Sequence, residues 1–373
     1  MALALGAPVG AAARTAGDFY AVPRALERFE PGELVRSESI TAPAGAKAWR
    51  VLYRSESVAG DPIAVSGVVV APTGRTNRPR PVVTWAHGTT GVADRCAPSQ
   101  QPDVAAELPF VGDLVGAGYV VAATDYEGLG TEGVHPYLVG QSEGRGVLDA
   151  ARAARDLRAT GAGKQVLVLG HSQGGQAALF AGELAARYAP DVDLAGVVAM
   201  APVTDLAVVV GVAASIPRAA GYAVMAATGF EAAYTEARAD TLLTPDAAAR
   251  ASLVDTACAG EIVDAFAATQ GSVFAVDPRS TPPFDQLIAE NTPGRTRTGA
   301  PVLIAHGTAD TLVPVALSQA FVPVFCSVGN EVELRTYPDA THGSVLPAAQ
   351  ADVLAWFAAR LTGAPASSSC AGR

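Results

Sequence analysis

The amino-acid sequence predicts an α/β fold with a mostly parallel β-sheet flanked by helices. Short, almost continuously apolar runs recur along the chain, as is typical of strands buried on both faces of a parallel sheet. These runs are spaced for intervening helices, and the segments 146–159 and 175–188 have helical composition. Half of the residues are hydrophobic and only 17% are charged, so the chain can bury a large core.

The strands are expected in two groups. The runs 49–55 and 62–72 predict two antiparallel strands, the second followed by a polar loop rich in Pro and Arg. A last helix is expected at 348–361, before a glycine, a proline and a small polar tail. The strands of the parallel part are expected at 80–88, 118–126, 164–172, 194–202, 300–307 and 331–338.

The regular alternation is interrupted after the sixth of these eight strands. Nearly a hundred residues, 203–298, separate it from the next strand, far more than a crossover connection needs. This segment contains apolar helical stretches and a Pro-rich return. We therefore expect a helical cap or lid over the carboxyl edge of the sheet, inserted between two parts of one core, 18–202 and 299–373.

The N-terminus and the cysteines indicate an exported protein. Residues 1–17 are small and apolar, and the alanines at 11–13 fit a signal-peptide cleavage site, so we expect a signal-like or disordered segment. The four cysteines have no CxxC spacing and no neighbouring histidines, which argues against zinc. Two disulfides fit a secreted chain, with free thiols in a cytosolic enzyme as the alternative. The cysteines are Cys96, Cys258, Cys326 and Cys370.

The charge of the chain argues against a nucleic-acid ligand, and its hydropathy argues against a membrane-spanning segment. The formal net charge is -10 and the positive residues form no cluster, so nucleic acid is not the expected ligand. The longest apolar runs, 206–216 and 219–230, are too short to span a bilayer. We therefore expect no integral membrane segment.

The stretch VLVLGHSQGGQAALF places Ser172 where a buried strand turns into a helix. Serine is a poor residue for either element, because its hydroxyl competes for backbone hydrogen bonds. GHSQG matches GxSxG, in which the glycines allow a strained turn that lifts the serine above the sheet at a helix N-terminus. The motif predicts the nucleophile elbow of an α/β-hydrolase fold, with Ser172 as the nucleophile.

A serine nucleophile requires a base and a carboxylate that orients the base. HGTADTLVP follows the penultimate strand and YPDATHGS follows the last, which gives the chain order Ser, Asp, His. Asp310 is therefore the predicted acid and His342 the predicted base. Asp205, directly after the sixth strand, is the alternative acid, because some hydrolases place the carboxylate there.

The remaining histidines have structural interpretations. His87 and His306 each precede a glycine directly after a strand, and His171 neighbours the nucleophile, so its side chain should point away. His135 lies in a loop, too early in the topology to be the base. Asp125, at the end of a strand, is expected to be a structural hydrogen-bond acceptor.

The developing oxyanion needs hydrogen-bond donors. HGTTG (87–91) follows a strand at the position of the oxyanion loop, and its glycines let backbone amides face the substrate. The backbone amide of Gln173, directly after the nucleophile, is the first predicted donor. The amide of Thr89 is the second, with Thr90 and Gly91 as alternatives.

Four motifs together resemble the secretory lipase family of α/β-hydrolases, known from fungi and actinobacteria: AHGTTGVADRCAPS, TDYEGLGTEGVHPYLVG, GHSQGG and HGTADTLVP. The likeness extends from about residue 18 to residue 361. It implies a secreted serine esterase acting on acylglycerols or related esters, with a helical lid. Fungal relatives lack a plain HGTTG, so the second oxyanion donor does not transfer from them. The resemblance also implies a disulfide from Cys96 to Cys258, which leaves Cys326 for Cys370.

The predicted reaction is hydrolysis of lipid-like or short acyl esters through an acyl-enzyme, with no cofactor and no metal. We expect a monomer whose partner is a small-molecule or lipid ester, with transient contact at a lipid interface. An acyltransferase with an alcohol acceptor is the nearest alternative, ahead of a serine peptidase and a noncatalytic binding protein. Residues 206–230 are expected to form the acyl site, with contact surface from Val208, Val209, Ile216 and Met225. The small residues that are expected to leave room for the acyl chain are Ala213, Ala214, Ala219, Ala220 and Gly221. Tyr126, Leu129 and Tyr137 are further candidates for the pocket wall.

Overall fold

The structure, a computed structural model, describes residues 19–213, 216, 218–269 and 271–370. The expected signal-like segment, 1–17, lies outside these residues. One sheet of nine strands has the order β1-β2-β3-β5-β4-β6-β7-β8-β9. β1, β2, β3 and β5 pair antiparallel in that order, and all pairs from β5 to β9 are parallel. The strands are β1 (Leu34–Ile40), β2 (Ala46–Glu56), β3 (Pro62–Pro72), β4 (Arg80–Ala86), β5 (Val120–Thr124), β6 (Ala162–His171), β7 (Asp193–Met200), β8 (Val302–Gly307) and β9 (Val332–Tyr337).

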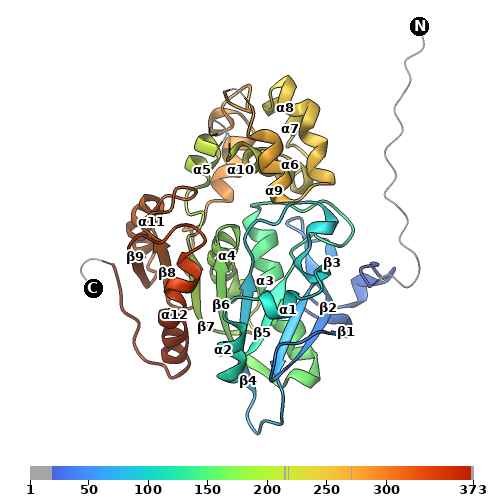
Figure 1. The fold of residues 1–373 in the computed structure, drawn as a ribbon, viewed down its shortest axis with the longest axis vertical. Coiled ribbons are helices and arrows are strands. Elements are labelled where there is room, and N and C mark those ends of the chain that lie inside the picture. The colour runs from blue at the N-terminus through green and yellow to red at the C-terminus, as the bar shows by residue number, and fades with distance from the viewer. Residues whose placement is uncertain (1–18, 214–215, 217, 270, 371–373) are drawn as a thin grey trace.

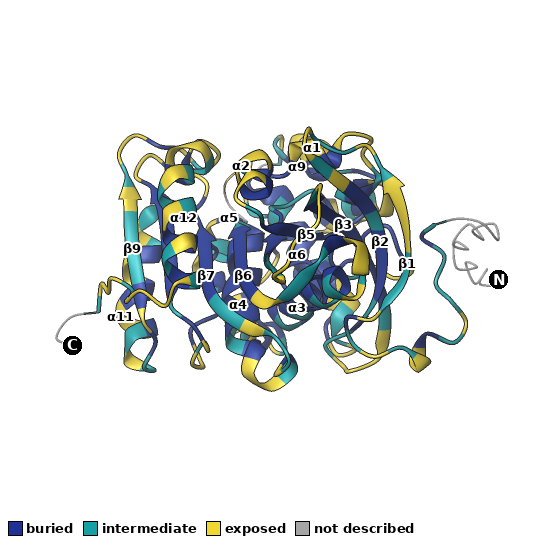
Figure 2. Ribbon diagram, turned by 90° about the horizontal axis from the view of Figure 1, so that it is seen from below, coloured by how far each residue is buried: buried dark blue, intermediate teal, exposed yellow. Residues whose placement is uncertain are grey.

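Helices cover both faces of this sheet. On one face lie α3 (Gly140–Asp156), α4 (Gln173–Tyr188) and α11 (Val315–Ser327). On the other lie α1 (Val104–Glu107), α2 (Val111–Gly116) and α12 (Val345–Leu361) (Figure 2). Each face has its own buried apolar cluster, and the central strands contribute side chains alternately to both. Burial on both faces explains the continuously apolar strands in the sequence.

The structure contains all eight expected strands and adds one, β1. Its sequence LVRSESI is largely polar, and no residue of this edge strand is fully buried, so it carries little of the apolar signal that marks the others. The long insertion therefore follows the seventh strand, β7, rather than the sixth. Helix α3 begins at Gly140, six residues before its expected start. A Cβ at Gly144 would lie 2.9 Å from the Ala181 nitrogen of α4, so glycine there permits close helix packing.

Residues 203–298, which we call the helical insert, lie at one end of the sheet (Figure 1). The insert has its own apolar core, which includes Leu206, Val224, Ile262 and Phe266. Among the described residues, no helix is both long enough and apolar enough to cross a membrane. The insert contains α5 (Leu206–Ala213), α6 (Ala220–Ala233), α7 (Ala239–Leu242), α8 (Pro245–Arg250), α9 (Ala259–Phe266) and α10 (Phe284–Glu290).

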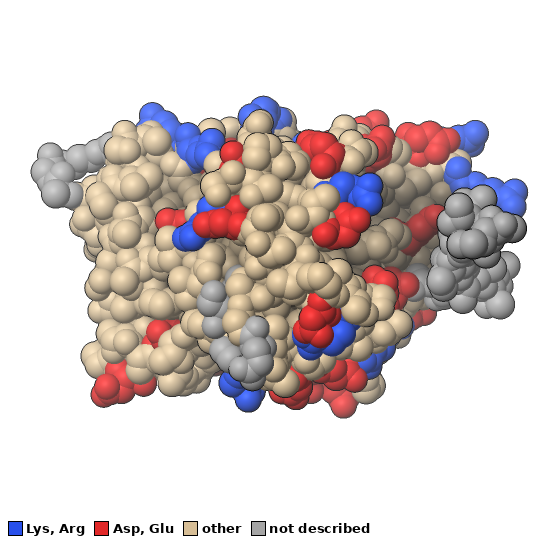
Figure 3. Space-filling view, turned by 90° about the horizontal axis from the view of Figure 1, so that it is seen from above, with Lys and Arg blue, Asp and Glu red and all other residues tan. Residues whose placement is uncertain are grey.

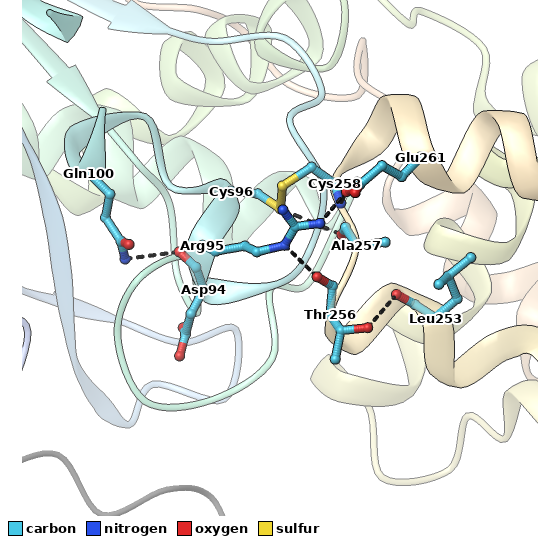
Figure 4. The surroundings of a disulfide bond; sticks show 9 residues. All are labelled: Asp94, Arg95, Cys96, Gln100, Leu253, Thr256, Ala257, Cys258 and Glu261. Atoms are coloured by element: carbon cyan, nitrogen blue, oxygen red, sulfur yellow. Dashed lines mark hydrogen bonds and ion pairs between the residues drawn. A yellow bond between two sulfur atoms is a disulfide. The ribbon is translucent and has the colours of Figure 1, made fainter. Parts of the chain in front are cut away.

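Two disulfides, Cys96–Cys258 and Cys326–Cys370, confirm the expected cross-links. The first joins the loop after β4 to the residue that precedes α9. Beside it, the Arg95 guanidinium donates to the Thr256 carbonyl and pairs with the Glu261 carboxylate (Figure 4). The core and the insert are thus connected covalently and by charge at one place.

Candidate active site

Ser172 lies in the turn between β6 and α4 with φ 60° and ψ -120°, an unusual conformation for a residue with a side chain. The flanking glycines make this turn possible. A Cβ at Gly170 would lie 1.9 Å from the Gly174 oxygen, and one at Gly174 would lie 1.9 Å from the Ala86 oxygen. The GxSxG spacing is therefore a steric requirement of the close approach between β6, α4 and β4.

The structure brings the three predicted residues together. The Ser172 Oγ lies 2.9 Å from His342 Nε2, and His342 Nδ1 lies 2.7 Å from Asp310 Oδ2. Asp310 follows β8, where its Oδ1 accepts hydrogen bonds from the backbone amides of Leu312 and Val313 at 2.9 and 2.8 Å. His342 follows β9. These contacts leave Oδ2 of the carboxylate aimed at the imidazole.

The environment of Asp310 keeps this carboxyl group ionised. Burial raises its pKa, but hydrogen bonds from His306 and His342 outweigh that effect and hold the pKa below its ordinary value. His306 Nε2 lies 3.3 Å from Asp310 Oδ2 and 2.8 Å from the Val313 oxygen. An ionised Asp310 accepts the Nδ1–H of His342, which leaves the Nε2 lone pair to accept the proton of Ser172.

Asp205, the alternative acid, makes a different contact. Its Oδ1 accepts a hydrogen bond from the Val208 backbone amide at 3.0 Å, in the first turn of α5. Short acidic side chains commonly cap helices in this way. His342 is paired with Asp310.

Two histidines that we interpreted as merely structural contact the predicted triad. His306 approaches Asp310 as described above, and the Nε2–H of His171 donates to the His342 carbonyl at 2.8 Å. Burial lowers the pKa of His171 to about 4, so this donor is neutral. Both residues lie at the carboxyl ends of parallel strands, the edge where ligands bind in such sheets. That position is the signal in the sequence that could have found them.

Two of the predicted oxyanion donors, Gln173 and Thr89, lie in the chain next to Ser172 or in the wall of the same pocket. Gln173 is the first residue of α4, where a backbone N–H has no acceptor within the helix. Thr89 and Thr90 line the same pocket as Ser172. The Thr89 hydroxyl is hydrogen-bonded to the Tyr137 hydroxyl at 2.8 Å. Gly91 instead forms a β-bridge with Cys258.

Ser172 opens into a pocket of about 1180 Å³ whose wall is mostly apolar. Tyr137 forms part of the wall as expected, whereas Tyr126 and Leu129 are buried in the main core. The insert contributes Val203, Val208, Val209, Val210, Val212, Ala213, Ile216, Arg218, Ala219, Tyr222, Ala223, Ala226 and Val263. The loop after β8 and the start of α11 contribute Thr311, Leu312, Val313, Pro314, Ala316 and Leu317.

Only some of the residues expected at the acyl site line the pocket, and Ala214 lies outside the residues that the structure describes. Ala219, Tyr222, Ala223 and Ala226 face the pocket, with the spacing of one helical face. Ala220 and Met225 are buried in the core of the insert, and a Cβ at Gly221 would lie 3.0 Å from the Ile262 oxygen. These three residues lie on the opposite face of α6, which composition alone did not reveal.

Within the described chain, no group of three or more His, Cys, Asp or Glu residues is arranged to hold a metal ion.

A mostly parallel sheet with a nucleophile elbow after β6, Asp310 after β8 and His342 after β9 defines an α/β-hydrolase. Residues 95–369 match the secretory lipase family, and the chain belongs to that family. It is therefore a carboxylic ester hydrolase. Membership also confirms the expected secretion.

Two curated relatives illustrate the range of the family. The chain is 26% identical over 381 residues to the secreted triacylglycerol lipase LIP4 of Malassezia globosa, covering 94% of this chain and 82% of the relative. It is 28% identical over 206 residues to the probable inactive lipase MT1628 of Mycobacterium tuberculosis, covering 50% of this chain and 45% of that protein.

Solved structures confirm the predicted fold. Candida antarctica lipase A in its closed state superposes with a TM-score of 0.80 at 19% identity, covering 94% of this chain and 87% of that chain. The rice cell wall degrading esterase LipA from Xanthomonas oryzae has a TM-score of 0.70 at 20% identity, covering 90% of this chain and 100% of that chain.

Proposed function

We propose that the chain hydrolyses carboxylic esters by a Ser-His-Asp triad, with Ser172 as nucleophile, His342 as base and Asp310 as the residue that orients the base. One observation carries this proposal: a continuous hydrogen-bonded path from Asp310 through His342 to the Ser172 hydroxyl, which opens into a large apolar pocket. A serine hydroxyl is a weak nucleophile without such a base.

The reaction has two halves. His342 Nε2 takes the proton of Ser172 as Oγ attacks the ester carbonyl, and the backbone amides of Gln173 and Thr89 donate to the oxyanion that forms. His342 then gives its proton to the alcohol oxygen of the ester. The bond between that oxygen and the carbonyl carbon breaks, so the alcohol leaves and the acyl group stays on Ser172. Water, activated by the same imidazole, attacks the acyl-enzyme and releases the carboxylic acid. Ser172 is thereby regenerated.

The substrate class that fits the pocket is an ester with an apolar acyl chain, such as an acylglycerol. The pocket wall from the insert is largely aliphatic, and a relative of this chain is named a triacylglycerol lipase. The molecular face over the insert is mostly uncharged, with side chains of both signs interspersed (Figure 3). The insert, 203–298, acts in this proposal as the cap of a core formed by 18–202 and 299–373.

The decisive experiment combines Ser172→Ala with covalent labelling. Removal of a triad nucleophile costs about a millionfold in kcat, so p-nitrophenyl ester turnover should disappear while the fold is retained. A fluorophosphonate should label the wild-type protein, and peptide mapping should place the label on Ser172. Turnover that persists in folded Ser172→Ala would contradict the proposal. Product analysis with a competing alcohol then distinguishes a hydrolase from an acyltransferase.

A further inference from the structure

A buried polar cluster surrounds the side chain of Gln173, the residue that follows Ser172. It consists of Glu143 on α3, His135 in the loop before α3, and the side chain of Gln173. The exposed fractions of these residues are 0%, 0% and 1%. Burying polar side chains so completely is costly unless they are paired, and the proposed reaction uses none of these three side chains.

The side chain of Gln173 is held from two sides. Its Nε2 lies 2.7 Å from Glu143 Oε1 and 2.9 Å from His135 Nε2. His135 Nδ1 lies 2.9 Å from the Glu127 carbonyl, which can only accept, so Nδ1 carries the proton and Nε2 accepts from Gln173. Glu143 Oε1 also accepts from the Leu138 backbone amide at 2.9 Å. Both hydrogens of the Gln173 amide are therefore used.

The protonation of the cluster is consistent with this geometry. Burial lowers the pKa of His135 to about 3, so its ring is neutral. Burial raises the pKa of Glu143 to about 8, so the carboxyl group is protonated at neutral pH. Among the described residues, Glu143 Oε2 has no hydrogen-bond partner, which is less costly for a neutral acid than for a buried charge.

The cluster is attached to the residue whose backbone must be placed most accurately. Ser172 is held in a strained conformation, and such strain persists only where the surrounding structure fixes it. The backbone N–H of Gln173 and its side chain share one Cα. Anchoring the end of that side chain restrains the peptide unit between Ser172 and Gln173.

We propose that Glu143 and His135 are positioning residues, which hold Gln173 so that its backbone N–H points at the oxyanion. This inference rests on the proposed function, because it assumes that the Gln173 amide is an oxyanion donor. Neither residue touches the reacting atoms; both act through the Gln173 side chain. Their contribution is expected in the transition state rather than in substrate binding.

Gln176 provides a matched control one turn further along α4. It is also a fully buried glutamine, and its Nε2 donates to the Asn291 carbonyl at 2.6 Å. Its backbone N–H, however, bonds within the helix to the Ser172 carbonyl. Losing its side-chain contacts should cost stability without redirecting an oxyanion donor.

The test compares Glu143→Leu, Glu143→Gln and Gln176→Leu in the full chain. The readouts are kcat and KM on p-nitrophenyl butyrate, the Ki of a butyl trifluoromethyl ketone, and Tm. This ketone forms a hemiketal oxyanion on Ser172.

We expect Glu143→Leu to lower kcat about 10- to 100-fold and raise Ki in parallel, with KM changed less than about threefold. Glu143→Gln, which mimics the protonated acid, should restore kcat to within about threefold of wild type. Gln176→Leu should lower Tm while its kcat stays within about threefold of the wild-type value.

Wild-type kcat and Ki in folded Glu143→Leu would overturn the inference. If that variant does not fold, His135→Phe removes the other acceptor while retaining an aromatic ring beside Tyr126, and the same kcat loss is expected. Unchanged kcat and Ki in His135→Phe would then overturn the inference. The proposed function fails separately, if Ser172→Ala retains turnover. Loss of turnover in Ser172→Ala with unaffected Glu143 and His135 variants rejects only the positioning role.

Discussion

The two candidate acids show how single residues acquire their roles at this site. Asp310 and Asp205 both follow core strands, and both accept backbone hydrogen bonds. Only Asp310 has its second carboxylate oxygen paired with the imidazole of His342. Asp310 follows β8, which lies beside β9 in the sheet, so its loop lies close to the loop that carries His342. Asp205 follows β7, which is not a neighbour of β9.

We expect Asp310→Asn to lower kcat about ten-thousandfold, because the amide no longer stabilises the correct imidazole tautomer. Asp205→Asn is the matched control, since asparagine caps a helix as well as aspartate does. Steady-state kinetics on one soluble ester measure both variants. A damaging Asp205→Asn combined with a mild Asp310→Asn would assign the acid to Asp205.

The pH dependence of stability should report Glu143. Its pKa rises from 4.5 to about 8 on folding, so between these pH values the folded protein holds one proton that the unfolded chain releases. The contribution of Glu143 to the free energy of unfolding should therefore fall by about 1.4 kcal/mol for each unit by which the pH rises over this range. Glu143→Gln lacks this loss, so its Tm relative to wild type should be higher at pH 8 than at pH 5. Parallel Tm profiles of the two proteins would contradict the burial of a neutral acid.

Residues with local motifs could be predicted from the sequence, and residues defined by packing could not. Ser172, Asp310 and His342 each follow a recognisable strand, and their chain order predicted the contacts that the structure contains. Glu143 lies within a helix, and nothing in its neighbourhood indicates that it meets Gln173 thirty residues later. That contact exists only because α3 and α4 pack on the same face of the sheet.

At the scale of elements, α6 has two apolar faces with different environments. Its composition predicted an apolar helix, but hydrophobic residues all around a helix contain no periodic signal that distinguishes a core face from a pocket face. Strands were predicted better, because burial on both faces makes them continuously apolar. The edge strand β1 lacks that burial and was missed.

The pocket face of α6 should set the preferred acyl chain. Ala223→Phe places a ring on the wall beside Tyr222 and Ala226, so long chains should lose access while short esters are still cleaved. Each buried methylene contributes at most about 0.8 kcal/mol, so wild-type kcat/KM should rise with chain length until the pocket is filled. Rates on a graded series of p-nitrophenyl esters give both profiles. Ala232→Phe, on the exposed end of the same helix, is the control. An Ala223→Phe profile equal to that of Ala232→Phe would mean that another element sets specificity.

At the scale of the whole molecule, the core and the helical insert are joined next to the predicted oxyanion loop. The Cys96–Cys258 disulfide and the Arg95 side chain connect them (Figure 4). Directly beside these links, the Ala259 backbone amide donates to the Thr90 carbonyl at 2.9 Å. The insert therefore restrains the loop that carries Thr89 as well as covering the pocket.

Removing each disulfide in turn can separate the effect on the stability of the chain from the effect on the position of the predicted oxyanion loop. Cys326–Cys370 joins the far end of α11 to the C-terminal tail, whereas the pocket residues of α11 lie at its start. The sequence separations are 162 residues for Cys96–Cys258 and 44 for Cys326–Cys370. Because loop-closure entropy grows only logarithmically, the chain-entropy model gives similar stabilisation, about 5 and about 4 kcal/mol.

We therefore expect both double alanine variants, Cys96→Ala with Cys258→Ala and Cys326→Ala with Cys370→Ala, to lower Tm by comparable amounts. Only the first should also lower kcat on a short ester, because it releases the loop that carries Thr89, the proposed second oxyanion donor. Kinetics are measured well below both Tm values, so that unfolding does not contribute. Equal kcat in the two variants would show that the Cys96–Cys258 link stabilises the chain without aligning the oxyanion loop, and the backbone bond from Ala259 to Thr90 would then suffice to hold it.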